Sequence, residues 1–188
     1  MLELILARGN LPGYAELKFP ASPADISEAF AVLDAISADV RSTIIRDVSC
    51  SVYGVGRYLW DADVRKESEF EKLGRIAELL DGMPPQEAAK LCGALDMESI
   101  NGLDDVLRVM ENADGCELFP DIGTERELGI FLVESGYMDV PEKLRPYLDY
   151  QAIGIEYHAN HSGAFTDDGY VARKETSAPE MGMSMKMG

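Results

Sequence analysis

The sequence is short of histidine, cysteine and positive charge. It has two histidines, three cysteines, and 17 lysines and arginines against 34 aspartates and glutamates. The formal charge of −17 gives a long-range negative field, which repels nucleic acid and attracts basic protein surfaces. The composition therefore argues against direct nucleic-acid binding. It fits either simple solubility or a basic protein partner.

The three cysteines, Cys50, Cys92 and Cys116, are widely spaced and form no CxxC pair. This pattern favours free thiols that are buried or partly buried over a zinc site or a disulfide framework. No apolar run approaches the roughly 20 residues that span a bilayer, so we expect a cytoplasmic protein without membrane contact. With 188 residues and 46% hydrophobic content, the chain can bury a core in one to about three small units.

The first predicted unit, residues 1–62, is α+β. Apolar and polar residues alternate in "YAELKFPAS", which predicts a strand, and Ser22 with Pro23 marks a helix start with Asp25 in its first turn. Apolar residues then recur at helical spacing as far as Ile36. The β-branched stretch "STIIRDVSCSVYGV" predicts a second strand.

The second predicted unit, residues 63–114, is helical. Three amphipathic segments, "SEFEKLGRIAELLDGM", "PPQEAAKLCGALDM" and "SINGLDDVLRVMENA", are separated by Gly82, Pro84 and Pro85 and interrupted by Gly102. Their apolar positions suffice for one inner face. Their outer face collects carboxylates with few cations.

The third predicted unit, residues 115–174, is again α+β. A short strand in "CELFPDI" precedes the helix "TERELGIFLVESG", where Thr124 is a good N-cap, Glu127 stands at the capping-box position and Gly136 closes the helix. More helix follows, with a start limited by Pro146, and "GAFTDDGYVA" predicts a hairpin with Asp168 and Gly169 in a type I′ turn. Residues 175–188 have no apolar period and are predicted to be disordered.

Both histidines lie in this third unit, and we weighed them as metal ligands for a metal-dependent hydrolase. His158 and His161 could share a helical face, but "NHSG" is typical of a turn that would separate the two rings. The simpler interpretation places one histidine on the surface and the other in a hydrogen bond within the hairpin region. Asp167 and Asp168 fit a turn better than a catalytic pair, because adjacent strand residues point to opposite faces.

Other enzymatic signals are equally thin. The stretch "YGVGRY" lacks the third glycine of a dinucleotide fingerprint and the helix start that should follow it. No serine lies in a nucleophile elbow, and no cysteine has a histidine partner by pattern. We therefore predict a protein that is not an enzyme and uses no cofactor or metal.

The carboxy-terminal stretch "PEKLRPYLDYQAIGIEYHANHSGAFTDDGYV" resembles the ArdA antirestriction family. The matching features run from a Tyr-hydrophobic-Asp-Tyr group through a helical glycine to a closing hairpin: Tyr147, Leu148, Asp149, Tyr150, Gly154, Gly163, Phe165, Gly169 and Tyr170. The resemblance is strongest from Glu117 to Val171. At the amino terminus, "LELILARGNLPGYAELKFPAS" departs from the family's aromatic and Asn-rich opening strand.

The resemblance also covers the upstream segment "ELGIFLVESGYMDVPEKL", whose counterpart in the family is associated with antirestriction activity. The residues that it places there are Phe131, Glu134, Tyr137 and Asp139. Family members are elongated three-unit α+β proteins, commonly dimers. They imitate DNA and occupy the DNA-binding groove of type I restriction–modification enzymes, so the resemblance implies this mechanism and a homodimer.

The physics of such imitation agrees with the charge of the chain. B-DNA carries one negative charge per roughly 1.7 Å of axis, and carboxylates spaced along a protein can satisfy the same cations. The six carboxylates that we predict to bind the partner lie on the outer face of the helical unit: Glu67, Glu71, Glu78, Asp104, Asp105 and Glu111. The alternative is an acidic adaptor that binds another basic protein.

Overall fold

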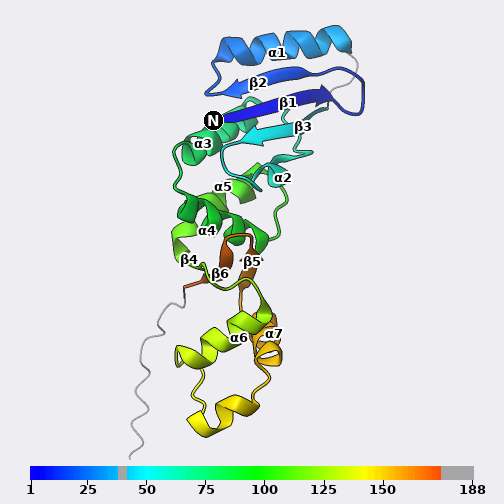
Figure 1. The fold of residues 1–188 in the computed structure, drawn as a ribbon. Helices are drawn as coiled ribbons and strands as arrows, with labels where there is room; N and C mark the ends of the chain where they lie inside the picture. Colours follow the sequence, from blue (N-terminus) through cyan, green and yellow to red (C-terminus); the bar gives the residue numbers. More distant parts are fainter. Residues whose placement is uncertain (38–41, 175–188) are drawn as a thin grey trace, which may run out of the picture.

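The computed structural model describes residues 1–37 and 42–174, which form an elongated α+β molecule (Figure 1). A three-stranded sheet lies at one end, helices fill the middle, a second three-stranded sheet follows, and a pair of helices forms the far end. The mixture of helices and short antiparallel sheets confirms the predicted α+β class. The predicted disordered tail, residues 175–188, lies outside the described residues.

The first sheet has the strand order β2-β1-β3, and all its pairs are antiparallel. Its strands are β1 (Leu2–Arg8), β2 (Ala15–Phe19) and β3 (Thr43–Cys50). The two predicted strands are confirmed, but the central strand β1 was not predicted. Leu2 lies opposite both Phe19 and Cys50, so β1 holds the sheet together.

Helix α1 (Pro23–Ile36) begins where the sequence predicts. The Ser22 side chain accepts a hydrogen bond from the backbone N–H of Asp25, and the Asp25 carboxylate accepts one from the backbone N–H of Ser22 at 2.7 Å. Hydrogen bonds from Ser22 also lower the pKa of Asp25. The predicted apolar face is only partly correct, because Leu33 is buried whereas Ile36 at the end of the helix is exposed.

A buried arginine joins this helix to the sheet. Arg8 Nη1 on β1 donates to Thr43 Oγ1 on β3 at 2.8 Å, and Nη2 pairs with Asp34 on α1. The guanidinium lies 5.5 Å from the ring centroid of Phe30 on the same helix, within cation–π range. One side chain therefore connects two strands and a helix.

The middle of the molecule contains α2 (Gly56–Leu59), α3 (Glu67–Leu80), α4 (Pro85–Asp96) and α5 (Leu103–Glu111). The last three confirm the predicted amphipathic helices. One cluster of buried side chains runs from the first sheet through these helices to the last strand; it includes Leu2, Leu17, Leu73, Ile76, Leu95, Val106 and Val171. The core is therefore continuous across residue 62.

The second sheet has the order β4-β6-β5, formed by Cys116–Phe119, Gly169–Arg173 and Gly163–Thr166 respectively. A short 3-10 helix, η1 (Ala113–Gly115), leads into β4. Residues 120–162, which lie between β4 and β5, leave the sheet and return to it. We call this segment the distal excursion; its two ends are held together because β4 and β5 both pair with β6.

The hairpin between β5 and β6 corrects the predicted turn by one residue. Thr166 pairs with Gly169, so the turn consists of Asp167 and Asp168 and Gly169 belongs to the strand. Neither aspartate has the positive φ that a type I′ turn needs; Gly169 does, with φ 133°. Thr166 Oγ1 stabilises the turn by donating to the Gly169 carbonyl at 2.8 Å.

The distal excursion contains α6 (Glu125–Glu134), the 3-10 helix η2 (Glu142–Tyr147) and α7 (Tyr150–Asn160). Thr124 caps α6 as predicted, because its side chain accepts from the backbone N–H of Glu127. Gly136 adopts φ 80° in the turn that ends the helix, as a closing glycine should.

Helices α6 and α7 touch through their backbones. A Cβ atom added at Gly154 would lie closer than 3.0 Å to the carbonyl oxygen of Glu125, and one added at Gly129 would lie equally close to the carbonyl oxygen of Tyr150. Both positions therefore require glycine. The side chains buried beside this crossing form a second, smaller cluster of Ile122, Leu128, Leu132 and Tyr170.

Cys50 and Cys92 are half-buried and Cys116 is buried, all as free thiols, which confirms the prediction for the cysteines. Within residues 1–37 and 42–174, every helix is too short or too polar to cross a membrane.

Candidate partner-binding surface

Three of the six predicted carboxylates form a row on α3. Glu67, Glu71 and Glu78 are four and seven residues apart, so they follow one face of the helix, and all three are exposed. Glu78 pairs with Arg75 at 3.1 Å. Across the described ranges 1–37 and 42–174, Glu67 and Glu71 make no ion pair or side-chain hydrogen bond, so both charges face solvent uncompensated.

The remaining three carboxylates lie on α5, which packs beside α3. Asp104 is 81% exposed and accepts from Lys72 of α3 at 2.7 Å, and Glu111 lies 4.0 Å from Arg75 of the same helix. The cations of α3 are thus placed between the two acidic rows. They hold the rows together and reduce the charge that Asp104 and Glu111 present outward.

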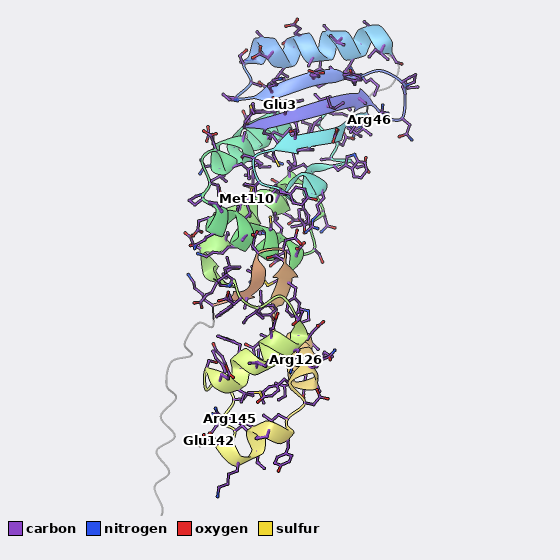
Figure 2. All side chains as sticks on the ribbon, viewed as in Figure 1. Glu3, Arg46, Met110, Arg126, Glu142 and Arg145 are labelled. Atoms are coloured by element: carbon purple, nitrogen blue, oxygen red, sulfur yellow. The ribbon has the colours of Figure 1, made fainter. Side chains whose placement is uncertain are left out.

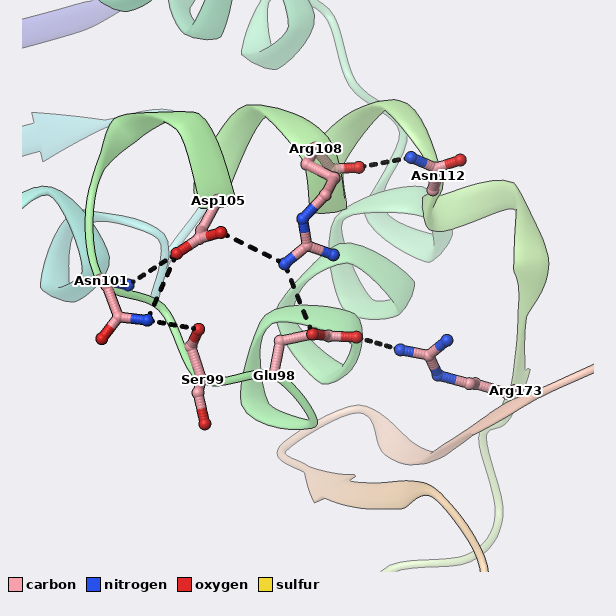
Figure 3. Close-up of polar contacts among 7 residues, drawn as sticks. All are labelled: Glu98, Ser99, Asn101, Asp105, Arg108, Asn112 and Arg173. Atoms are coloured by element: carbon pink, nitrogen blue, oxygen red, sulfur yellow. Dashed lines mark hydrogen bonds and ion pairs between the residues drawn. The ribbon is translucent and has the colours of Figure 1, made fainter.

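Asp105 turns to the start of its own helix (Figure 3). Its Oδ2 accepts from the backbone N–H of Asn101 at 3.0 Å, and its Oδ1 accepts from Arg108 Nη2 at 3.4 Å. The bond from the Asn101 backbone is the main reason why the pKa of Asp105 is lowered. Asp105 therefore stabilises the loop before α5 and is partly occupied within the chain.

Glu98, which was not predicted, connects the helices to the second sheet. One oxygen accepts from Arg108 of α5 at 3.5 Å, and the other pairs with Arg173 of β6 (Figure 3). Its partners lie 10 and 75 residues away along the chain, so no local pattern could reveal this role.

The predicted antirestriction segment forms the end of α6 and the turn after it. Phe131 is half-buried, with its ring centroid 5.0 Å from that of Phe119. Glu134, Tyr137 and Asp139 are exposed. The segment thus has one aromatic side chain directed to the sheet and three side chains available to solvent.

A comparison with protein families shows which family the chain belongs to. A model described as antirestriction protein (ArdA) matches residues 8–172. This range begins at the last residue of β1 and includes the other strands of the first sheet, the middle helices, the distal pair and nearly all of the second sheet. The chain belongs to the ArdA family of antirestriction proteins. A comparison with curated proteins gives no match.

The match extends the ArdA resemblance well beyond residues 117–171, over which it is strongest in the sequence. It begins within β1 and covers β2, α1 and β3. The divergent amino-terminal stretch is therefore matched from Arg8 onward. Carboxylates on α3 and α5 and the segment around Phe131 all lie within the matched range.

The two histidines of this ArdA member have separate contacts. His158 Nδ1 lies 3.3 Å from the Tyr170 hydroxyl of β6, while His161 stacks on Tyr157 with ring centroids 3.9 Å apart. His161 is exposed, so the predicted split between a surface histidine and a hairpin histidine is confirmed. Over the described part of the chain, no three His, Cys, Asp or Glu side chains gather as a metal site would require.

The distal end of this ArdA protein also exposes large apolar side chains that the sequence analysis did not group. They come from the turn after α6, from η2 and from α7: Tyr137, Met138, Leu144, Tyr147 and Ile155. Tyr147 is the most exposed of them, at 85%. All five lie in the excursion between β4 and β5.

Proposed function

We propose that this chain inhibits type I restriction–modification enzymes by imitating DNA and occupying their DNA-binding groove. Membership of the antirestriction family over residues 8–172 is the observation that carries the proposal. A non-enzymatic mechanism follows, since a charged surface that competes with DNA needs no reaction centre.

The shape of the molecule supports this mechanism. The sheets and helices follow one another along a single long axis (Figure 1), and acidic side chains lie near both ends of it, Glu3 near one end and Glu142 near the other (Figure 2). A groove built for duplex DNA presents cations along a line. An elongated protein with a formal charge of −17 can meet many of them at once.

The internal ion pairs leave the formal charge at −17, but they occupy several of the cations of the chain. Lys72 and Lys90 pair with neighbouring carboxylates, and Arg57 pairs with Asp96. Because such cations are already paired, they are poorly placed to repel the lysines and arginines of a partner. Exposed carboxylates such as Glu67 and Glu71 remain available to bind them.

Competition with DNA for a purified type I enzyme tests the proposal. Single changes such as Glu71→Gln should weaken inhibition very little, because an exposed ion pair contributes about 0–1 kcal/mol. Inhibition should weaken progressively as these changes are combined, up to a fivefold variant that neutralises Glu67, Glu71, Glu78, Asp104 and Glu111. It spares Asp105, whose role in the fold would confuse the result.

Salt provides the matched control. Exposed charges are screened over about 8 Å at physiological ionic strength, so added salt should weaken inhibition by the wild-type protein more than inhibition by the fivefold variant. Circular dichroism checks that both proteins are folded. A fivefold variant with wild-type inhibition and wild-type salt response would exclude this surface.

The exposed apolar side chains of the distal end support a homodimer through that end. Charged substitution at two of them, Tyr147→Glu with Ile155→Lys, should yield a monomer by light scattering while circular dichroism stays unchanged. A variant that keeps the mass of the wild-type oligomer would place the interface elsewhere, and a wild-type monomer would refute the dimer.

A further inference from the structure

A groove of about 910 Å³ lies between the first half of α1 and the length of α3. Its apolar lining includes Phe19, Ile26, Phe30 and Phe70, and the last two rings pack edge to face with centroids 5.6 Å apart. A groove of this size, lined by aromatic and aliphatic side chains, is typical of a binding site. The predicted acidic row explains only one of its walls.

The α3 wall of the groove is negatively charged. Glu67, Glu71, Glu78 and Asp81, all from α3 or its end, line the groove. Glu78 pairs with Arg75 and Asp81 with the terminal amine of Met1 at 3.4 Å, which leaves Glu67 and Glu71 without a counter-charge.

The cations at the groove do not change its sign. Among the described residues that line it, Arg65 is the only Lys or Arg, and Arg65 already pairs with Asp63 at 2.8 Å. The groove is therefore apolar at its base and negative along one rim. The unpaired carboxylates, one helical turn apart, are separated by about 6 Å along the axis of α3.

We infer that this groove receives a basic amphipathic helix of a partner protein. Apolar side chains on one face of such a helix would fill the base, and two lysines or arginines about one turn apart would meet Glu67 and Glu71. Nucleic acid and anionic membranes are disfavoured by the negative rim, as is a second copy of this chain with its own charge of −17. Glu67 and Glu71 also belong to the proposed inhibitory surface, but peptide binding in the groove can succeed or fail whether or not the chain inhibits restriction enzymes.

A synthetic peptide provides the probe. It carries leucines on one helical face and lysines one turn apart beside them, and its matched control carries glutamates in place of the lysines. Fluorescence anisotropy should show binding of the lysine peptide and none of the glutamate peptide to the full chain. Equal binding of both peptides, or no binding of either, would overturn the inference.

Two variants locate the binding. Glu67→Gln with Glu71→Gln should weaken the lysine peptide about tenfold, as loss of two exposed ion pairs predicts. The charge-matched control, Asp104→Asn with Glu111→Gln, changes carboxylates that do not line the groove and should leave binding within about twofold. If both pairs of changes weaken binding equally, the peptide responds to net charge and the groove is not its site.

The third variant plugs the groove without removing charge. Gly74 lies on the groove side of α3, and a Cβ atom there meets only Phe19 Cδ1, at 4.0 Å. Gly74→Leu should fill part of the groove and abolish peptide binding, whereas Gly74→Ala should retain it, and circular dichroism checks that both variants are folded. Unchanged binding by Gly74→Leu would refute the site, and loss of self-association in this variant would instead show a second copy in the groove.

Discussion

The two ends of the molecule bury their apolar side chains in different ways. The sheet end shares one large cluster with the middle helices, so a side chain such as Leu4 or Ile76 belongs to a core with many neighbours. The distal end has the small cluster around Leu128 and Leu132, and there helices α6 and α7 meet backbone to backbone at Gly129 and Gly154. The distal end also carries exposed side chains such as Tyr147.

The two ends should therefore respond differently to a single substitution. A large core spreads the effect of one substitution over many contacts, whereas a close backbone crossing depends on two residues that cannot grow. We therefore expect the distal end to be the part of the chain where a single methyl group does most harm. The following predictions test that contrast, from the largest expected effect to the smallest.

The strongest test is the same substitution in two helices. Gly154→Ala places a methyl group against the carbonyl of Glu125 and should destabilise the protein by about 3 kcal/mol or more, at the upper end of overpacking effects. Gly74→Ala in α3 makes only an ordinary van der Waals contact with Phe19, at 4.0 Å, and should stabilise by about 0.5–1 kcal/mol through higher helix propensity.

Two probes can assign the damage to one end. Trp60, the single tryptophan, ends α2 directly after Leu59 of the large cluster, so its fluorescence reports that end, while circular dichroism reports all helices. In Gly154→Ala, helical signal should be lost at lower denaturant than the fluorescence signal. Wild-type unfolding of this variant would show that α6 and α7 do not touch as described.

Neighbouring residues of α6 should differ in the next test. Leu132 is 1% exposed, and Leu132→Ala should cost about 2–5 kcal/mol. A buried Phe131 would predict about 3–5 kcal/mol for Phe131→Ala. Because the ring is only half-buried against Phe119, we expect about 1–2 kcal/mol instead. Denaturant unfolding measures both, and a larger loss at Phe131 would mean that the helix face is misassigned.

A smaller effect should follow from loosening the middle against the second sheet. Glu98→Gln weakens the pairs with Arg108 and Arg173 and should cost about 1 kcal/mol, because both arginines are largely exposed. Glu71→Gln removes the same charge from a side chain that has no ion pair with any described residue, so this change should be nearly neutral. Equal melting temperatures for these two variants would show that the Glu98 contacts contribute nothing to stability.

Local signals predicted local structure well. Ser22 with Asp25, and Thr124 with Glu127, fall within one turn of the chain, so short spacing suffices to place both helix starts. The hairpin turn was misplaced by one residue because Gly169 can serve either as a turn residue or as a strand residue with positive φ. Only the pairing register distinguishes these two roles.

The sequence predicts where the carboxylates of the candidate site lie, but not which of them are already paired within the chain. Helical spacing alone places Glu67 and Glu71 on one face. It does not show that Asp104 is paired with Lys72 of α3, or that Asp105 accepts from the backbone N–H of Asn101. Strand β1 lies between two partner strands and has no fully exposed residue along its length, so a clear alternation of buried and exposed positions is missing there. Glycines inside α6 and α7 were a usable signal, since a glycine within a helical pattern often marks close packing.

The smallest predicted effect concerns the start of α6 and its response to pH. The Glu127 carboxylate accepts from the backbone N–H of Gly123 at 2.9 Å and from Thr124 Oγ1 at 3.0 Å, and the first of these bonds is the main reason why the pKa of Glu127 is lowered below its ordinary value near 4.5. A lowered pKa in the folded state means that the carboxylate stabilises the fold above about pH 4.5, and that this stabilisation is lost as pH falls through the lower folded value. Glu127→Gln should therefore melt at a lower temperature than wild type near neutral pH, and the gap should close in acid. Glu134→Gln, at the other end of the same helix, is the control, because a negative charge there opposes the helix dipole and its removal should leave the melting temperature equal or higher. Thermal unfolding by circular dichroism from pH 7 down to about pH 3 measures both variants, and a gap for Glu127→Gln that stays constant over this range would contradict the role given to its charge.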